Sequence, residues 1–195
     1  MEMLSKLRWI AFALLGVLAL TIIIWGMSIL VGNLTNEPGD TTGPTLEISP
    51  VANADVVRYT IDGPVIASSE HRSFTIEVSR SVVLMRVYAD YGQTVLAEKS
   101  YKNNDLAYDN LLESLETQGA SKRNRGTDVE DDYAEQGACS AGSRFIVEIG
   151  DDVRRWTTNC KDVDGTAAGN MRSIRLLFTR QVPDYKELTK GVNIL

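Results

Sequence analysis

The feature that most constrains this chain of 195 residues is an uncharged apolar run at residues 9–31. Thr21 and Ser28 are the only polar side chains in the run, so a helix built from it has no hydrophilic face. At about 1.5 Å per residue such a helix is roughly 34 Å long, enough to cross a hydrocarbon core of about 30 Å. The run therefore predicts one transmembrane helix, with the lipid bilayer as its partner.

The charges on either side of this run predict its orientation. Lys6 and Arg8 precede it, whereas Glu37 and Asp40 follow it. The positive-inside rule then places residues 1–8 in the cytoplasm and the remainder of the chain outside. The alternative is a cleaved secretory signal, but the apolar core of such a signal usually spans about 7–15 residues. We therefore expect an uncleaved signal-anchor and a single-pass protein of the cell membrane.

The part of the chain beyond this helix is acidic. Removing Glu2, Lys6 and Arg8 from the totals of 20 basic and 26 acidic residues leaves 18 and 25, a formal charge of −7. Such a surface repels nucleic acid, which we do not expect as a partner. The basic residues of 122–125 are followed at once by acidic residues in 128–135, and we expect these opposite charges to neutralise each other in a solvated, mobile loop. A calcium site is the alternative, but the acids lack the spacing of a calcium-binding loop.

The external part divides into a stalk and one domain. Residues 32–53 contain Pro38, Pro44 and Pro50 among glycines and threonines, which is typical of an extended linker. Residues 54–195 are a common size for one domain. Alternating apolar residues predict strands near 57–61, 74–78, 82–88 and 94–101, and their short links favour antiparallel pairing.

The apolar period then changes from two residues to about 3.6. A helix is predicted between Asp105, as its N-cap, and Gly119, just past its end. Two strands at 144–149 and 153–158 form a hairpin, a second helix covers about 170–180, and residues 186–190 add a short helical turn. This order of four strands, a helix, two strands and a helix predicts an α+β domain. We expect an antiparallel sheet of about six strands with two helices on one face, which leaves the opposite face open to solvent or a partner.

Cys139 and Cys160 are the only cysteines of the chain, and both follow the predicted span. In an oxidising compartment their default state is a disulfide. Residues whose numbers sum to about 302 lie opposite each other in the predicted hairpin, and 139 and 160 sum to 299. The two cysteines therefore meet near its open end. A metal site would need further thiols or histidines, and redox catalysis would favour a C-x-x-C pair. We expect no metal and no cofactor.

His71 is the only histidine, so a Ser-His-Asp triad or a zinc hydrolase would have to use it. It stands in a polar link between two predicted strands, without a nucleophile motif such as G-x-S-x-G. We interpret it as a solvated loop histidine and assign no catalytic residue. Trp156 and Phe145 lie within the disulfide hairpin. Such residues are more often core than ligand platform, but an exposed tryptophan there would mark a binding face.

Several segments of this domain resemble a known group of proteins. They are residues 61–65 (IDGPV), 137–145 (GACSAGSRF), 155–160 (RWTTNC), 174–178 (IRLLF) and 181–185 (QVPDY). These segments are similar to single-pass, membrane-anchored proteins of small-genome candidate-phylum bacteria, a group without a known activity. The resemblance implies a location and a domain extent, but no chemistry. The order of the elements is also similar in layout to the emfourin-type inhibitors of metalloproteases.

The sequence as a whole predicts a membrane-anchored, extracytoplasmic binding domain without catalysis, whose partner would be another protein of the cell envelope. Two alternatives stay open. One is a cell-envelope hydrolase that uses His71, which would require a pocket with a serine and a carboxylate within hydrogen-bonding distance of the ring. The other is a protease inhibitor.

Overall fold

The computed structural model describes residues 50–127 and 131–192 of the chain. The predicted transmembrane helix at residues 9–31 and most of the predicted stalk lie outside these ranges. Within them, no helix is both long enough and apolar enough to cross a bilayer. Residues 48–195 form one compact unit, and the following description concerns this unit alone.

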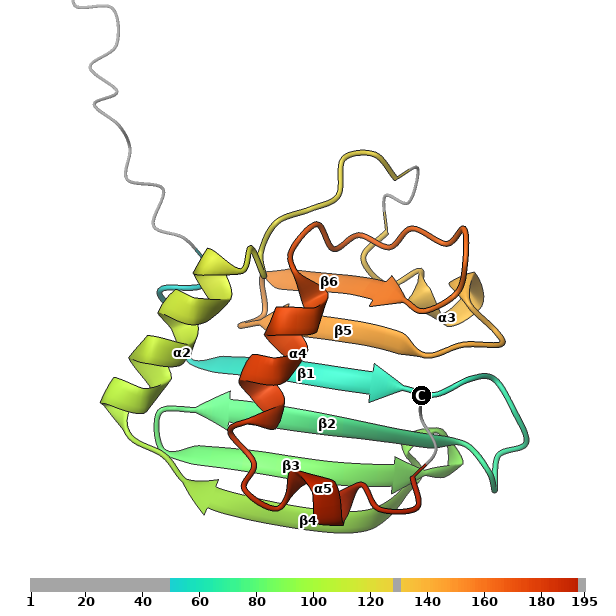
Figure 1. Ribbon diagram of the computed structural model, residues 1–195, viewed down its shortest axis with the longest axis horizontal. Helices are drawn as coiled ribbons and strands as arrows, with labels where there is room; N and C mark the ends of the chain where they lie inside the picture. Colours follow the sequence, from blue (N-terminus) through green and yellow to red (C-terminus); the bar gives the residue numbers. More distant parts are fainter. Residues whose placement is uncertain (1–49, 128–130, 193–195) are drawn as a thin grey trace, which may run out of the picture. The chain divides into compact units, whose positions relative to one another are not determined.

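The core of the fold is one six-stranded antiparallel sheet with the strand order β4-β3-β2-β1-β5-β6 (Figure 1). The strands are β1 (Val56–Asp62), β2 (Arg72–Ser79), β3 (Val82–Ala89), β4 (Thr94–Lys102), β5 (Arg144–Ile149) and β6 (Val153–Thr158). All six strands were predicted, as was their arrangement in an antiparallel sheet, but the pairing of β1 with β5 was not. The α+β class is therefore confirmed for the described residues.

The two longer helices, α2 (Asp105–Thr117) and α4 (Met171–Thr179), lie across the same face of the sheet (Figure 1). The N-cap of α2 is Asn104, whose side chain accepts a hydrogen bond from the backbone N–H of Ala107, and not Asp105 as predicted. Gly119 follows the helix at a positive φ of 71°, as its predicted position after the end of the helix requires. Three short elements complete the fold: a 3-10 turn η1 (Asp90–Gly92), α3 (Glu135–Ala138) and α5 (Tyr185–Leu188).

The space between the sheet and these helices holds the hydrophobic core. Successive side chains of a strand point to opposite faces, so Val57, Tyr59 and Ile61 of β1 all face the helices and are buried. Tyr59 stacks on Phe178 of α4 with ring centroids 5.4 Å apart. Val51 is also fully buried in this core, so the folded domain begins a few residues before the boundary at residue 54 that the sequence predicted.

The hairpin of β5 and β6 has the predicted register and ends in the predicted disulfide. Arg144 pairs with Thr158 and Ile149 with Val153, and Cys139 is bonded to Cys160 with their Cα atoms 5.8 Å apart. Gly142 lies against this bond. A Cβ atom at residue 142 would come within 2.7 Å of one sulfur and 2.9 Å of the other, so only glycine fits there.

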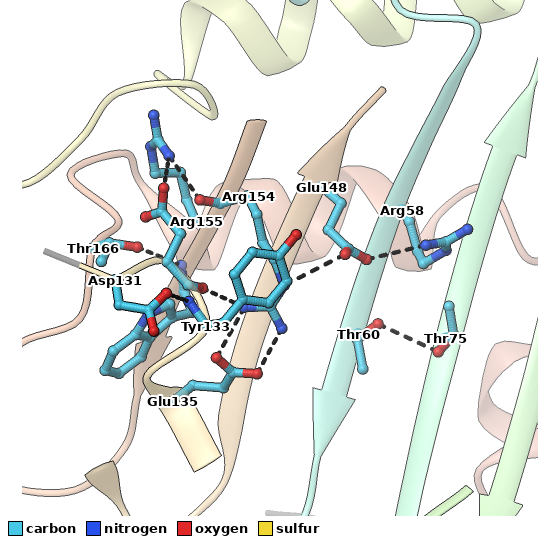
Figure 2. A network of polar contacts seen from close by, with 12 residues as sticks. Arg58, Thr60, Thr75, Asp131, Tyr133, Glu135, Glu148, Arg154, Arg155 and Thr166 are labelled. Carbon is cyan, nitrogen blue, oxygen red and sulfur yellow. Dashed lines mark hydrogen bonds and ion pairs between the residues drawn. The ribbon is translucent and has the colours of Figure 1, made fainter. Parts of the chain in front are cut away.

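The charged segment between α2 and β5 corrects one prediction. Arg123 does form an ion pair with Asp132, so opposite charges of this segment neutralise each other as expected. The segment is not merely solvated, however, because strand β6 binds it. Arg155 contacts Asp132 at 2.8 Å. Arg154 forms two hydrogen bonds to the buried carboxylate of Glu135 (Figure 2). Arg154 and Arg155 lie outside this segment in the sequence, so the composition of the segment alone could not reveal these contacts.

A buried tyrosine makes the stability of this domain sensitive to alkaline pH. Tyr108 of α2 is fully buried and donates a hydrogen bond to the carbonyl of Ala54, and burial raises its pKa to about 12. Tyrosine in the unfolded chain has a pKa of about 10 and loses its proton first. Between these values the unfolded state binds fewer protons, so the free energy of unfolding falls as the pH rises above about 10.

We expect urea unfolding of residues 48–195 between pH 8 and 11.5 to show this decline. Tyr108→Phe removes the group that titrates. The free energy of unfolding of the variant should therefore fall less steeply with pH, and the difference in slope should correspond to at most one proton. Burial raises the pKa of Tyr59 as well, so part of the decline should remain in the variant. Equal slopes for the wild type and Tyr108→Phe would show that Tyr108 titrates normally in the folded protein.

Candidate functional site

The face of the sheet opposite α2 and α4 carries many polar side chains, which form rows across the strands, although Ile146 and Trp156 on the same face are buried. In one row, Arg58 of β1 lies between Glu77 of β2 and Glu148 of β5. Its guanidinium is 2.9 Å from Glu77 and 3.3 Å from Glu148. The row continues through Arg154, which lies 3.5 Å from Glu148 and also binds Glu135 (Figure 2). Carboxylates and guanidinium groups thus alternate across four strands and onto α3.

The next row contains small side chains, which leave a hollow in this face of the sheet. Thr60 and Thr75 lie side by side on β1 and β2, with their hydroxyl oxygens 3.3 Å apart (Figure 2). Longer side chains surround these small residues, and together they form a groove of about 820 Å³. This volume falls within the roughly 300–1,000 Å³ of typical ligand sites. The groove is lined by Arg58, Thr60, Asp62, Val65, Ser73, Thr75, Glu77, Leu84, Arg86, Tyr88, Tyr91, Gly92, Arg144 and Glu148.

Each of the three arginines that line the groove has a carboxylate partner. Arg58 binds Glu77 and Glu148, and its hydrogen bond to Glu77 is the main reason that its pKa is raised. Arg86 binds Glu98 of β4 at 2.5 Å, and this hydrogen bond raises its pKa in the same way. Arg144, which is nearly fully buried, donates to Asp62 at 2.7 Å and to the carbonyl of Gly63 at 2.6 Å. The carboxylates therefore hold the three guanidinium groups in position.

His71 lies beneath Tyr91, which lines the groove, and its burial corrects the interpretation of a solvated histidine. Its side chain has no exposed area, because the ring of Tyr91 covers it with centroids 3.8 Å apart and planes 12° from parallel. Nε2 lies 3.1 Å from a carboxylate oxygen of Asp62, but off the direction of a hydrogen bond. The sequence showed only a polar link, and the residue that buries His71 comes from the turn after β3.

The turn that carries Tyr91 has an unusual backbone. Asp90 and Tyr91 both have positive φ angles, 52° and 54°, which residues other than glycine rarely adopt. The phenol oxygen of Tyr91 compensates, since it accepts a hydrogen bond from the N–H of Ile66 and donates one to the carbonyl of the same residue. Such strain persists only where the surrounding contacts impose it, and it is often found at functional sites.

The arrangement around His71 meets only one of the two conditions for a hydrolase. A carboxylate, that of Asp62, is close to the ring. Within the described residues, however, neither ring nitrogen of His71 makes a hydrogen bond, to a serine or to any other group. The ring is also covered by Tyr91 and is not among the residues that line the groove. Among the described residues, His71 therefore has a nearby carboxylate but no hydrogen-bonded serine.

Trp156 and Phe145 do not form a shared binding face. Trp156 has no exposed area and lies opposite Ile146 in the β5–β6 ladder, whereas Phe145 lies opposite Thr157. Neighbouring residues of a strand point to opposite faces, so the two rings lie on opposite sides of the sheet. Phe145 packs against the core beneath the helices. Most polar residues of the groove could be recognised in the sequence only as the polar positions of strands whose apolar positions face the core. That pattern does not distinguish a binding residue from an ordinary exposed one.

The comparisons with known proteins add no further constraint: no protein-family model matches the chain, and no curated protein is significantly similar to it.

Proposed function

We propose that this protein is a single-pass, membrane-anchored binding module, and that its domain binds a ligand outside the cytoplasm through the polar groove. The observation that carries the proposal is the open face of the sheet. A sheet face without a helix over it normally presents solvated, mobile side chains. Here the charged groups form ion pairs around a hollow floored by small hydroxyl residues, and the pair of Arg144 with Asp62 is largely buried, which is the organisation of a preformed site.

Two further features support the location. The apolar run at residues 9–31 has the length of a membrane span, and basic residues precede it. The disulfide between Cys139 and Cys160 is of the kind that persists in oxidising compartments and is rare in the cytosol. We therefore expect the bond to persist in a domain outside the cytoplasm and to be reduced in a cytosolic one.

Protease protection tests the topology. The full-length chain is expressed with an epitope tag at its C-terminus in a bacterial host. Protease is then added to cells whose outer membrane is permeabilised and whose inner membrane is intact. We expect loss of the tag from these cells while a cytoplasmic marker survives, and loss of both after lysis. Survival of the tag until lysis would place the domain in the cytoplasm and contradict the proposal.

Obstruction of the groove tests the binding surface. Thr75→Trp places a large ring on the groove floor without altering the core, and Glu113→Trp places the same ring on the exposed side of α2. We expect the domain without the apolar run (residues 48–195), and its Glu113→Trp control, to sediment with isolated cell envelopes, and Thr75→Trp in the same domain to lose most of this binding. Equal sedimentation of all three proteins would show that the groove is not the surface that binds.

A further inference from the structure

The charges around the groove indicate what kind of ligand it takes. Three guanidinium groups, those of Arg58, Arg86 and Arg144, line it together with three carboxylates, so the lining residues have no net charge. Each of these arginines is already bound to a carboxylate at 3.3 Å or less. A phosphate or a polyanion would have to displace those partners, and a cationic ligand would have to displace the arginines. The balance therefore favours an uncharged ligand that hydrogen-bonds.

Tyr91 adds a flat apolar surface to this polar site. One face of its ring lies on His71, and its hydroxyl is occupied by the backbone of Ile66. The residue nevertheless remains 43% exposed and lines the groove. Tyr91 thus presents the outer face of its ring to a ligand. Because the ring is already held in place, binding costs little further side-chain conformational entropy.

We propose that the groove binds a neutral oligosaccharide, with one sugar ring packed on Tyr91. This assignment rests on the proposed function and specifies its ligand. The C–H groups on one side of a pyranose ring fit an aromatic face, while its hydroxyls both donate and accept hydrogen bonds. The hydroxyls of Thr60, Thr75 and Ser73 on the floor, and the fixed arginine–carboxylate pairs on the walls, supply partners of both kinds.

The test measures binding of neutral hexasaccharides to the full-length chain in a detergent without a sugar headgroup. The probes are the hexamers of the cellulose, chitin, starch and xylan types, and titration calorimetry gives the Kd of each. We expect at least one to bind. Tyr91→Ala should weaken that binding about tenfold, because it removes the ring, whereas Tyr91→Phe should stay within about threefold, because it keeps the ring. Leu106→Ala, an exposed position on α2, serves as the control and should bind as the wild type does.

A second variant keeps the test valid if Tyr91→Ala disturbs the strained turn. Thr75→Val keeps the volume of the side chain and removes a hydroxyl from the groove floor, so it should also weaken binding while leaving the unfolding temperature nearly unchanged. Failure of all four hexasaccharides to bind, or equal Kd values for the wild type, Tyr91→Ala and Thr75→Val, would overturn the saccharide assignment. If Thr75→Trp still abolished binding to cell envelopes, for example through a peptide, the proposed function would stand without this ligand.

Discussion

Replacing Arg144 by methionine is expected to lower the free energy of unfolding by about 3 kcal/mol. The guanidinium is nearly fully buried, and it binds both the carboxylate of Asp62 and the carbonyl of Gly63. Methionine fills a similar volume but satisfies neither group. Loss of one partner from a buried ion pair typically costs about 3–5 kcal/mol, and the lower end applies because the side chain of Asp62 is 26% exposed. Urea unfolding of residues 48–195 measures the change.

Two further variants separate this effect from a general loss of arginine. Arg86 lies on the same face of the sheet, but its pair with Glu98 is largely exposed. Arg86→Met should therefore cost less than about 1 kcal/mol. Adding Asp62→Asn to Arg144→Met removes the unpaired carboxylate and should recover part of the loss. If Arg144→Met were as mild as Arg86→Met, the buried pair would not hold this end of the groove together.

Removal of the disulfide is expected to have an effect of similar size. The bond links residues separated by 21 positions, and in the chain-entropy model a loop of this length contributes roughly 3 kcal/mol. Cys139→Ser should therefore lower the unfolding temperature in non-reducing buffer. The bond also lies beside Gly142 at the segment that leads into Arg144, so its loss should loosen the same end of the sheet.

The reductant supplies the control for this second prediction. With the bond reduced, the wild type and Cys139→Ser should unfold at nearly the same temperature, because both then lack the constraint on the unfolded chain. A Cys160→Ser variant should behave like Cys139→Ser without reductant. Equal unfolding temperatures of the wild type and both variants in non-reducing buffer would mean that the two thiols are not joined in the purified protein.

The groove itself was only partly predictable. A sheet face left open by α2 and α4 is expected from the sequence, and the structure has one. The contacts of Arg58 and Tyr91 were not predicted, and His71 was predicted to lie in solvent. The contact between Arg58 and Glu148 joins residues 90 positions apart, and Tyr91 reaches His71 from a different turn. A pattern within a short window contains no information on such pairs, because they depend on which strands become neighbours.

What the sequence by itself determined are the local features: the strands with their alternating faces, the C-terminal end of α2 at Gly119, the register of the β5–β6 hairpin, and the disulfide that this register brings together. Each of these features depends on residues that are close in the chain, and such residues have few other segments with which they could pair. Only the tertiary structure decided that β1 pairs with β5 as well as with β2. That pairing brings Arg58 between two carboxylates and sets Asp62 beside Arg144. Burial was also decided by the tertiary structure. Whether a polar residue such as His71 is exposed to water depends on which side chains pack over it, and these come from other segments of the chain.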